Sequence, residues 1–217
     1  MPLYKEPAMN ELERRIVDIS YQERIGHLSS TLNAVNIIEE IYQTKNPQDT
    51  FILSSGHAAL ALYVVLEKHQ NQNAVELFHK HGVHPHRDVE HGIHCSTGSL
   101  GMGITVAVGY ALANPDQDVY CLVSDGECGE GSVWEALRFA YEKRLHNLKI
   151  YVNINGQIAY DVIDRDYLVR RLKAFLPNVE IRHTNAPDWP WAQGVLTHYY
   201  VLKPEDYRAL CENDSAN

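Results

Sequence analysis

The sequence of 217 residues lacks any run of about twenty apolar residues, so no helix is expected to span a membrane. It also lacks the pattern of a secretion signal, because residues 1–10 are largely polar and interrupted by proline. No repeat, low-complexity tract or linker is apparent, which predicts one domain over residues 1–217. Since 45% of the residues are hydrophobic, this domain can bury a core, and we expect it to be cytoplasmic.

Basic charge is scarce as well. The chain has 19 Lys and Arg against 28 Asp and Glu, a formal net charge of −9. Nucleic acids and anionic membranes attract proteins through basic patches, so we expect neither as the main partner. The four cysteines lie in or beside predicted core segments, and their even number therefore does not indicate disulfides. They are Cys95, Cys121, Cys128 and Cys211.

Hydrophobic periodicity predicts an alternation of strands and helices. Strands are expected at residues 51–53, 119–123, 149–152 and 179–182. Helices are expected at residues 11–21, 32–43, 57–69, 74–81, 100–113, 130–144 and 164–174, with a last helix from Pro204. This order predicts a doubly wound α/β fold, in which a mainly parallel sheet is flanked by helices.

Two polar residues follow consecutive predicted strands. Asp125 comes directly after the apolar run 119–123, and Asn155 follows the next strand. Because a strand, helix and strand place both strand ends at the same sheet edge, we expect the two residues to be neighbours. Gly126 lets the backbone bend toward a ligand. Carboxylate and amide oxygens suit Mg²⁺ or Ca²⁺, and Mg²⁺ often completes its shell with phosphate oxygens, so the pair predicts a cation that holds a diphosphate.

The stretch Ser124-Asp125-Gly126-Glu127, followed thirty residues after Asp125 by Asn155, resembles the Gly-Asp-Gly…Asn signature of thiamine-diphosphate enzymes. The resemblance is to the diphosphate-binding (PP) domain of transketolase. Three further segments match the same family in order: residues 25–32 (Ile-Gly-His-Leu-Ser-Ser-Thr-Leu), residues 51–63 with a Ser-Ser-Gly-His turn, and residues 96–103 (Ser-Thr-Gly-Ser-Leu-Gly-Met-Gly). With four ordered matches, the chain is identified as a member of this family.

The resemblance implies thiamine diphosphate as the cofactor, with Mg²⁺ or Ca²⁺. It assigns the metal to the side chains of Asp125 and Asn155 and to the carbonyl of Gln157. It places the Gly126 amide on a phosphate and counts the neighbouring Glu127 among the cofactor-binding residues.

His57 follows a glycine at the start of a predicted helix, where its imidazole and the free backbone N–H groups can meet an anion. In the family this histidine contacts the diphosphate and the substrate; the alternative is a capping or solvent-facing histidine. Resemblance assigns Gly98 and Leu100 to the aminopyrimidine. Their alternative is a glycine-rich loop that only caps the helix through Ala113.

Three further residues have roles by resemblance. His27 would lie near the thiazolium and the substrate oxygen and transfer protons at a pKa close to neutral. Glu130 would join a carboxylate network across the interface between subunits, or it is a solvated glutamate at a helix start. His198 would touch the diphosphate.

Residues 79–94 are rich in histidine. Imidazoles and a thiol could form a zinc site, although the spacings fit no paired ligand pattern. In transketolases the equivalent loop carries a histidine before proline that reaches the hydroxyls of the donor sugar, and His84 fits this position best, with His86 as the competing choice. The other histidines are expected at the surface. The residues are His79, His81, His84, His86, His91 and His94, with Cys95 beside the last.

The resemblance covers one domain of a larger enzyme, since the pyrimidine-binding domain of the family is absent from the sequence. We therefore expect a split transketolase, with two copies of this chain and two of a companion that supplies the pyrimidine-binding and C-terminal domains. The implied reaction is a transferase reaction, the transfer of a two-carbon ketol unit from a ketose phosphate to an aldose. His27, His57 and His84 would orient hydroxyls and move protons.

Three departures keep alternatives open. Ser124 replaces the first glycine of the signature, Met102 stands where glutamine or histidine is common, and residues 174–198 are short for the family. A degenerate, noncatalytic subunit that serves as a binding partner is therefore the second hypothesis. Deoxyxylulose-phosphate synthase shares the Gly-His-Leu-x-Ser-Ser stretch but is disfavoured by the turn at residues 54–58.

Overall fold

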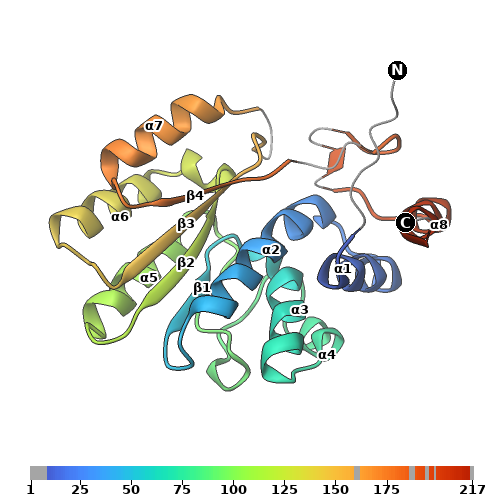
Figure 1. Ribbon diagram of the computed structural model, residues 1–217, viewed down its shortest axis with the longest axis horizontal. Coiled ribbons are helices and arrows are strands. Elements are labelled where there is room, and N and C mark those ends of the chain that lie inside the picture. The colour runs from blue at the N-terminus through green and yellow to red at the C-terminus, as the bar shows by residue number, and fades with distance from the viewer. Residues whose placement is uncertain (1–8, 159–161, 186–188, 194–195, 198, 216–217) are drawn as a thin grey trace.

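The computed structural model describes residues 9–158, 162–185, 189–193, 196–197 and 199–215. A parallel sheet lies at its centre, with strand order β1-β2-β3-β4 (Figure 1). The strands are β1 (Thr50–Leu53), β2 (Val119–Ser124), β3 (Leu148–Ile154) and β4 (Glu180–His183). The register pairs Leu53 with Leu122 and Ser124 with Asn153, so the carboxyl ends of the first three strands meet at one edge.

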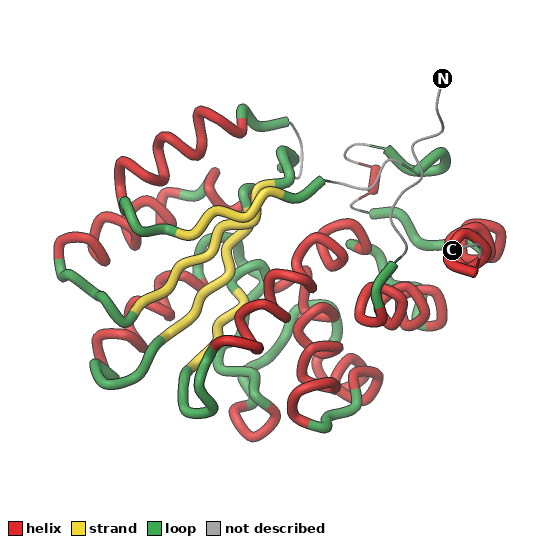
Figure 2. The backbone as a smooth tube through the Cα atoms, viewed as in Figure 1, coloured by secondary structure: helices red, strands yellow, loops and turns green. Residues whose placement is uncertain are grey.

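Helices cover both faces of the sheet (Figure 2). Side chains such as Phe51 and Leu122 face a core formed with α1 (Glu11–Gln22), α2 (Leu28–Thr44), α3 (Ala59–Gln70) and α4 (Ala74–His81). Ile52 and Cys121 face the opposite core, formed with α5 (Gly103–Ala113), α6 (Gly131–Glu142) and α7 (Arg165–Phe175). Alternate strand residues thus point to opposite faces, and the expected α/β fold is confirmed.

The last helix, α8 (Pro204–Ser215), packs beside the first. The rings of Tyr21 and Tyr207 stack with centroids 4.2 Å apart, and the Tyr207 hydroxyl lies 2.9 Å from an Asp18 carboxylate oxygen. Figure 1 shows α1 and α8 together, away from the sheet. The C-terminal segment is thereby attached to the N-terminal helix.

Three helix starts differ from the expectation by two residues or more. The helix expected from residue 32 begins at Leu28, where the Thr31 hydroxyl donates to the His27 carbonyl at 2.9 Å. The helix expected from residue 57 begins at Ala59, after a 3₁₀ turn, Gly56–Ala58. The helix expected from residue 100 begins at Gly103, because Gly101 has a φ of 74° that cannot continue a helix.

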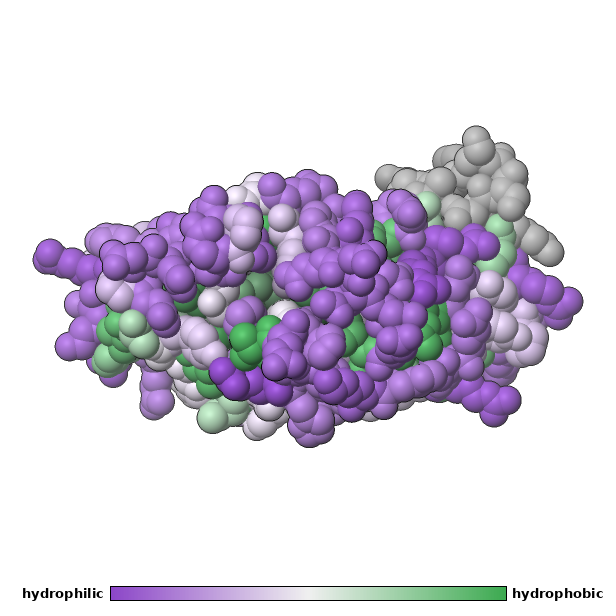
Figure 3. Space-filling view, turned by 90° about the horizontal axis from the view of Figure 1, so that it is seen from below, coloured by the Kyte–Doolittle hydropathy of each residue, from purple (hydrophilic) through white to green (hydrophobic). Residues whose placement is uncertain are grey.

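Within the described part of the chain, no helix is both long and apolar enough to cross a bilayer. None of the four cysteines forms a disulfide within the described part of the chain. Figure 3 shows a largely polar face on which hydrophobic residues surface in separate patches, including at the end of the molecule where α5 lies.

Candidate active site

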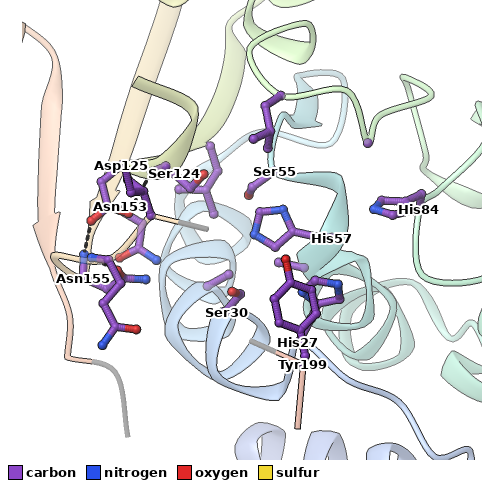
Figure 4. Close-up of a pocket in the computed structure, with 18 residues that line it drawn as sticks. His27, Ser30, Ser55, His57, His84, Ser124, Asp125, Asn153, Asn155 and Tyr199 are labelled. Atoms are coloured by element: carbon purple, nitrogen blue, oxygen red, sulfur yellow. Dashed lines mark hydrogen bonds between the residues drawn. The ribbon is translucent and has the colours of Figure 1, made fainter. Parts of the chain in front are cut away.

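A pocket of about 280 Å³ opens where the first three strands end (Figure 4). It is bounded by the start of α2, the turn after β1, and the loops after β2 and β3. Nine residues expected from the sequence line it: His27, His57, His84, Gly98, Leu100, Asp125, Gly126, Asn155 and Gln157. The fold therefore brings residues from several separate segments to one place.

Asp125 lies at the base of this pocket and is 1% exposed. Its Oδ2 accepts hydrogen bonds from the backbone N–H groups of Asn155 at 2.9 Å and Gly156 at 2.7 Å, and Oδ1 accepts one from Gly126 at 3.0 Å. Burial raises the pKa of Asp125 to about 6, because a carboxylate away from water is less readily ionised, while these N–H donors act in the opposite direction. The carboxylate is thus held against the loop that carries Asn155, and the expected proximity of the two residues is confirmed.

The loop after β3 has a defined shape. The Asn155 Oδ1 accepts from the Gln157 N–H at 2.8 Å, and the Asn155 carbonyl accepts from the Arg165 guanidinium. Gly156 has a φ of 86°, and an added Cβ would lie 2.4 Å from the Arg165 Nε. Only glycine fits such a position without strain, so Gly156 allows the chain to turn tightly around Asp125.

These oxygen donors fit a divalent cation. The Asp125 carboxylate, the Asn155 amide and the Gln157 carbonyl belong to residues that line the pocket, and all are hard donors of the kind Mg²⁺ and Ca²⁺ prefer. The Asn155 oxygen uses one lone pair for Gln157 and has a second. Such a cation would also favour the ionised form of Asp125, which burial disfavours.

Two histidines lie on the opposite wall. The rings of His27 and His57 have centroids 5.6 Å apart, and the ring of Tyr199 is 5.8 Å from that of His27 (Figure 4). His27 has a φ of 60° at the N-terminal end of α2, which turns the chain into the helix beside the pocket. His57 lies within the 3₁₀ turn that precedes α3, and it lines the pocket.

Gly56 and Gly98 allow three segments to pack closely: the turn after β1, the loop that carries His84 and the loop that carries Gly98. A Cβ on Gly56 would lie 2.6 Å from the Thr97 carbonyl carbon, and one on Gly98 would lie 3.0 Å from the His84 ring. The Thr97 N–H also donates to the Pro85 carbonyl at 3.1 Å. His84, rather than His86, is the histidine of this loop found among the lining residues.

Sequence reasoning missed several pocket residues. Asn153 is 5% exposed, and its Oδ1 accepts from the Thr184 hydroxyl at 2.6 Å, so its amide group is available to the pocket. Ser30 and Ser55 add hydroxyls. The alternation of β3 puts Asn153 and Asn155 on the same side, a signal that could have identified Asn153.

Two expected residues lie elsewhere. Glu127 is 0% exposed and is not among the described residues that line the pocket, so the structure does not place it as a direct ligand contact. Glu130 also lies outside the pocket lining, exposed at the N-cap of α6. This position is compatible with both readings of Glu130, a solvated glutamate and a residue at an interface between subunits. His198 lies outside the described residues.

The histidine-rich segment is organised around a carboxylate. The Asp88 Oδ2 lies 2.6 Å from the Lys80 Nζ, 2.8 Å from the His91 Nδ1 and 3.1 Å from the His81 Nε2. Among the residues that the structure describes, no group of three or more His, Cys, Asp or Glu side chains is arranged to hold a metal. The zinc alternative is therefore wrong for this part of the chain. The Asp88 carboxylate is hydrogen-bonded to Lys80 and His81 instead.

Asp88→Asn is expected to lower the free energy of unfolding at neutral pH by about 1 kcal/mol. Its partners, His91 foremost, hold the pKa of Asp88 well below its usual range. The ionised form therefore stabilises the fold fully above the unfolded pKa of about 3.9, and the contribution decreases below that pH until it is lost at the lower pKa that Asp88 has in the fold. In thermal unfolding, the difference between variant and wild type should be full at pH 7 and smaller at pH 3. Glu90→Gln, an exposed neighbour, is the control; an equal difference at both pH values would contradict the ionic explanation.

Comparison with known proteins now identifies the class. The family model "Transketolase, thiamine diphosphate binding domain" matches residues 8–175. A transketolase from Pichia stipitis, solved with sedoheptulose 7-phosphate, superimposes with a TM-score of 0.72 over 95% of this chain and 41% of its own, at 20% identity. The chain therefore belongs to the transketolase family, through its thiamine-diphosphate-binding domain.

Curated relatives include complete enzymes as well as single subunits. One of the subunits of apulose-4-phosphate transketolase from Phocaeicola vulgatus is 32% identical over 162 residues, 65% of this chain and 57% of the relative. Human transketolase is 35% identical over 151 residues, 60% of this chain and 24% of the relative. The 6-deoxy-6-sulfo-D-fructose transketolase subunit SqwG of a Clostridium species is 31% identical over 151 residues, 60% of this chain and 55% of the relative. The chain thus matches about half the length of the separate subunits and a quarter of the complete enzyme.

Proposed function

We propose that this chain is the diphosphate-binding subunit of a split, cytoplasmic transketolase. The main support for the proposal is the geometry of the pocket. The Asp125 carboxylate accepts hydrogen bonds from the backbone of Asn155 and Gly156, and His27 and His57 lie on the opposite wall. When bound, thiamine diphosphate would supply the thiazolium carbon that carries a two-carbon ketol unit from a ketose phosphate to an aldose. The remaining chemistry belongs to side chains of this chain and of its companion.

On this chain, Asp125, Asn155 and the Gln157 carbonyl would hold Mg²⁺ or Ca²⁺, which neutralises the diphosphate. The Gly126 N–H would bind a phosphate oxygen, and Gly98 and Leu100 would lie against the aminopyrimidine. His57 and His27 would bind substrate oxygens and move protons at their ring nitrogens, with His84 on the donor hydroxyls. By resemblance, His198 would also touch the diphosphate.

A companion chain would complete the enzyme. Two relatives are named as subunits, which supports a partner that supplies the pyrimidine-binding and C-terminal domains. Helix α5 is apolar along its length, and the side chains of Leu112 within it and of Met102 at its N-cap are about half exposed. A helix that is apolar all round is normally covered, so this face suits contact with a companion or a second copy in a heterotetramer. Glu130 would lie near such a contact.

The test is calorimetry on the chain purified from its native source with any chain that remains bound to it. Thiamine diphosphate should bind with measurable heat in the presence of MgCl₂ and without heat in the presence of EDTA. The same preparation should transfer a ketol unit from a ketose phosphate to an aldose. Absence of both heat and transfer would instead favour a noncatalytic subunit.

A further inference from the structure

Glu127 is buried beneath the pocket and bonded to three segments of the chain. Its Oε1 accepts from the Ser54 hydroxyl at 2.6 Å and from the Gly101 N–H at 3.1 Å. Its Oε2 accepts from the Ser124 N–H at 2.9 Å and faces the Ser124 hydroxyl at 3.2 Å. One carboxylate therefore connects the end of β1, the loop before α5 and the end of β2.

Each of these donors lies next to pocket residues. Ser54 precedes the turn that carries Ser55 and His57, and Gly101 follows the loop that carries Leu100. Ser124 directly precedes Asp125 and itself lines the pocket. The positions of the diphosphate, aminopyrimidine and metal residues are thus coupled through one side chain that lies outside the pocket lining.

The groups around the Glu127 carboxylate require a hydrogen-bond acceptor between them. All four groups around Glu127 can donate, and an ionised carboxylate offers only acceptors, so the two sets match. The Ser54 oxygen in turn accepts from the Ile104 N–H at 3.1 Å, which extends the network into the first turn of α5. Burial raises the pKa of Glu127, and the four donors oppose this by favouring its charged form.

The packing around the network leaves little freedom to rearrange. A Cβ on Gly103 would lie 2.5 Å from the Ser54 Cα, and one on Gly101 would lie 2.5 Å from the Ser132 hydroxyl. Ser132 also donates to the Gly101 carbonyl at 2.9 Å. A change at Glu127 would therefore be transmitted to the loops rather than absorbed locally.

We propose that Glu127 is a positioning residue, which sets the relative placement of the three loops that hold the cofactor without contacting the cofactor itself. The inference rests on the proposed function for its effect on binding. It also explains Ser124, the departure from the family glycine, because the added hydroxyl lies within hydrogen-bonding distance of Glu127.

Glu127→Gln tests the proposal, since it keeps the size of the side chain but replaces one acceptor oxygen by an N–H₂ donor. We expect the dissociation constant for thiamine diphosphate with MgCl₂ to rise at least tenfold, measured by calorimetry on the complex with its companion. The control is Glu39→Gln. Glu39 is 8% exposed and is bonded to Lys68, His69 and Gln43, away from the pocket. Its substitution should lower the melting temperature and leave the dissociation constant unchanged.

Amide hydrogen exchange supplies a readout that does not depend on the cofactor. In Glu127→Gln the N–H groups of Gly101 and Ser124 should exchange at least tenfold faster, whereas Glu39→Gln should leave them protected. Unchanged exchange and unchanged affinity in Glu127→Gln would overturn the positioning role. If wild type fails to bind the cofactor, the proposed function falls, and exchange still decides the role of Glu127. Should Glu127→Gln not fold, Ser54→Ala removes one of the donors and should weaken binding severalfold.

Discussion

Asp125→Ala is expected to abolish magnesium-dependent binding of thiamine diphosphate. The substitution removes the carboxylate charge from the pocket and releases the N–H groups of Gly126, Asn155 and Gly156. A cation would lose its only charged ligand among the three donors assigned to it. The dissociation constant should rise by at least 100-fold, or binding heat should disappear, in calorimetry with MgCl₂.

The fold should survive this change. Leaving the three buried N–H donors without an acceptor would cost about 3–9 kcal/mol together if no water reached them, against a typical domain stability of about 5–15 kcal/mol. Because they face an open pocket, water can replace much of the loss. Asp125→Asn keeps an oxygen acceptor and should be more stable, yet it should also bind weakly because the charge is gone. Asp164→Ala is the control: Asp164 caps α7 through the Tyr167 N–H at 2.8 Å and lies outside the pocket lining. Tight binding by Asp125→Ala would contradict the metal assignment.

Gly56→Ala should have the second-largest effect. A Cβ at this position would lie 2.6 Å from the Thr97 carbonyl carbon and 2.7 Å from the Gly98 nitrogen. Both are backbone atoms, so the turn that carries His57 and the loop that carries Gly98 would have to separate. We expect the free energy of unfolding to fall by about 1–3 kcal/mol and cofactor affinity to fall at least tenfold. Thermal unfolding and calorimetry measure the two effects.

Gly109→Ala provides the opposite case. Gly109 lies within α5, and an added Cβ would meet no atom within 4 Å. Alanine is favoured over glycine in helices by up to about 1 kcal/mol, so this variant should be slightly more stable and bind normally. If Gly56→Ala behaved like Gly109→Ala, the close packing of the two loops would not matter for the pocket.

The sheet and the central pair of residues could be predicted because each depends on local patterns. Apolar runs marked β2 and β3, and a right-handed crossover leaves little choice about where Asp125 and Asn155 lie. The observed hydrogen bond from the Asn155 N–H to Asp125 follows from that geometry. Several other pocket residues predicted from sequence motifs lie there for the same reason, because they follow strands whose carboxyl ends lie at the same edge of the sheet.

The role of Glu127 could not be predicted, because two of its partners, Ser54 and Gly101, are 73 and 26 residues away in the chain. A motif places it beside Asp125, but only packing decides that its side chain points away from the pocket. Asn153 was missed because it lies just past the predicted strand at residues 149–152, and its amide is oriented by Thr184, which follows β4 and is distant in the sequence. The helix start at Leu28 was missed because Ser29, Ser30 and Thr31 are weak helix formers, stabilised there by burial.

The most direct test is a crystal structure of the chain, with the companion that copurifies with it, grown with CaCl₂ and thiamine diphosphate. We expect a calcium ion about 2.3–2.6 Å from a carboxylate oxygen of Asp125 and from the Asn155 Oδ1, with diphosphate oxygens completing its shell. A diphosphate bound without a cation between these two side chains, or bound outside this pocket, would contradict it.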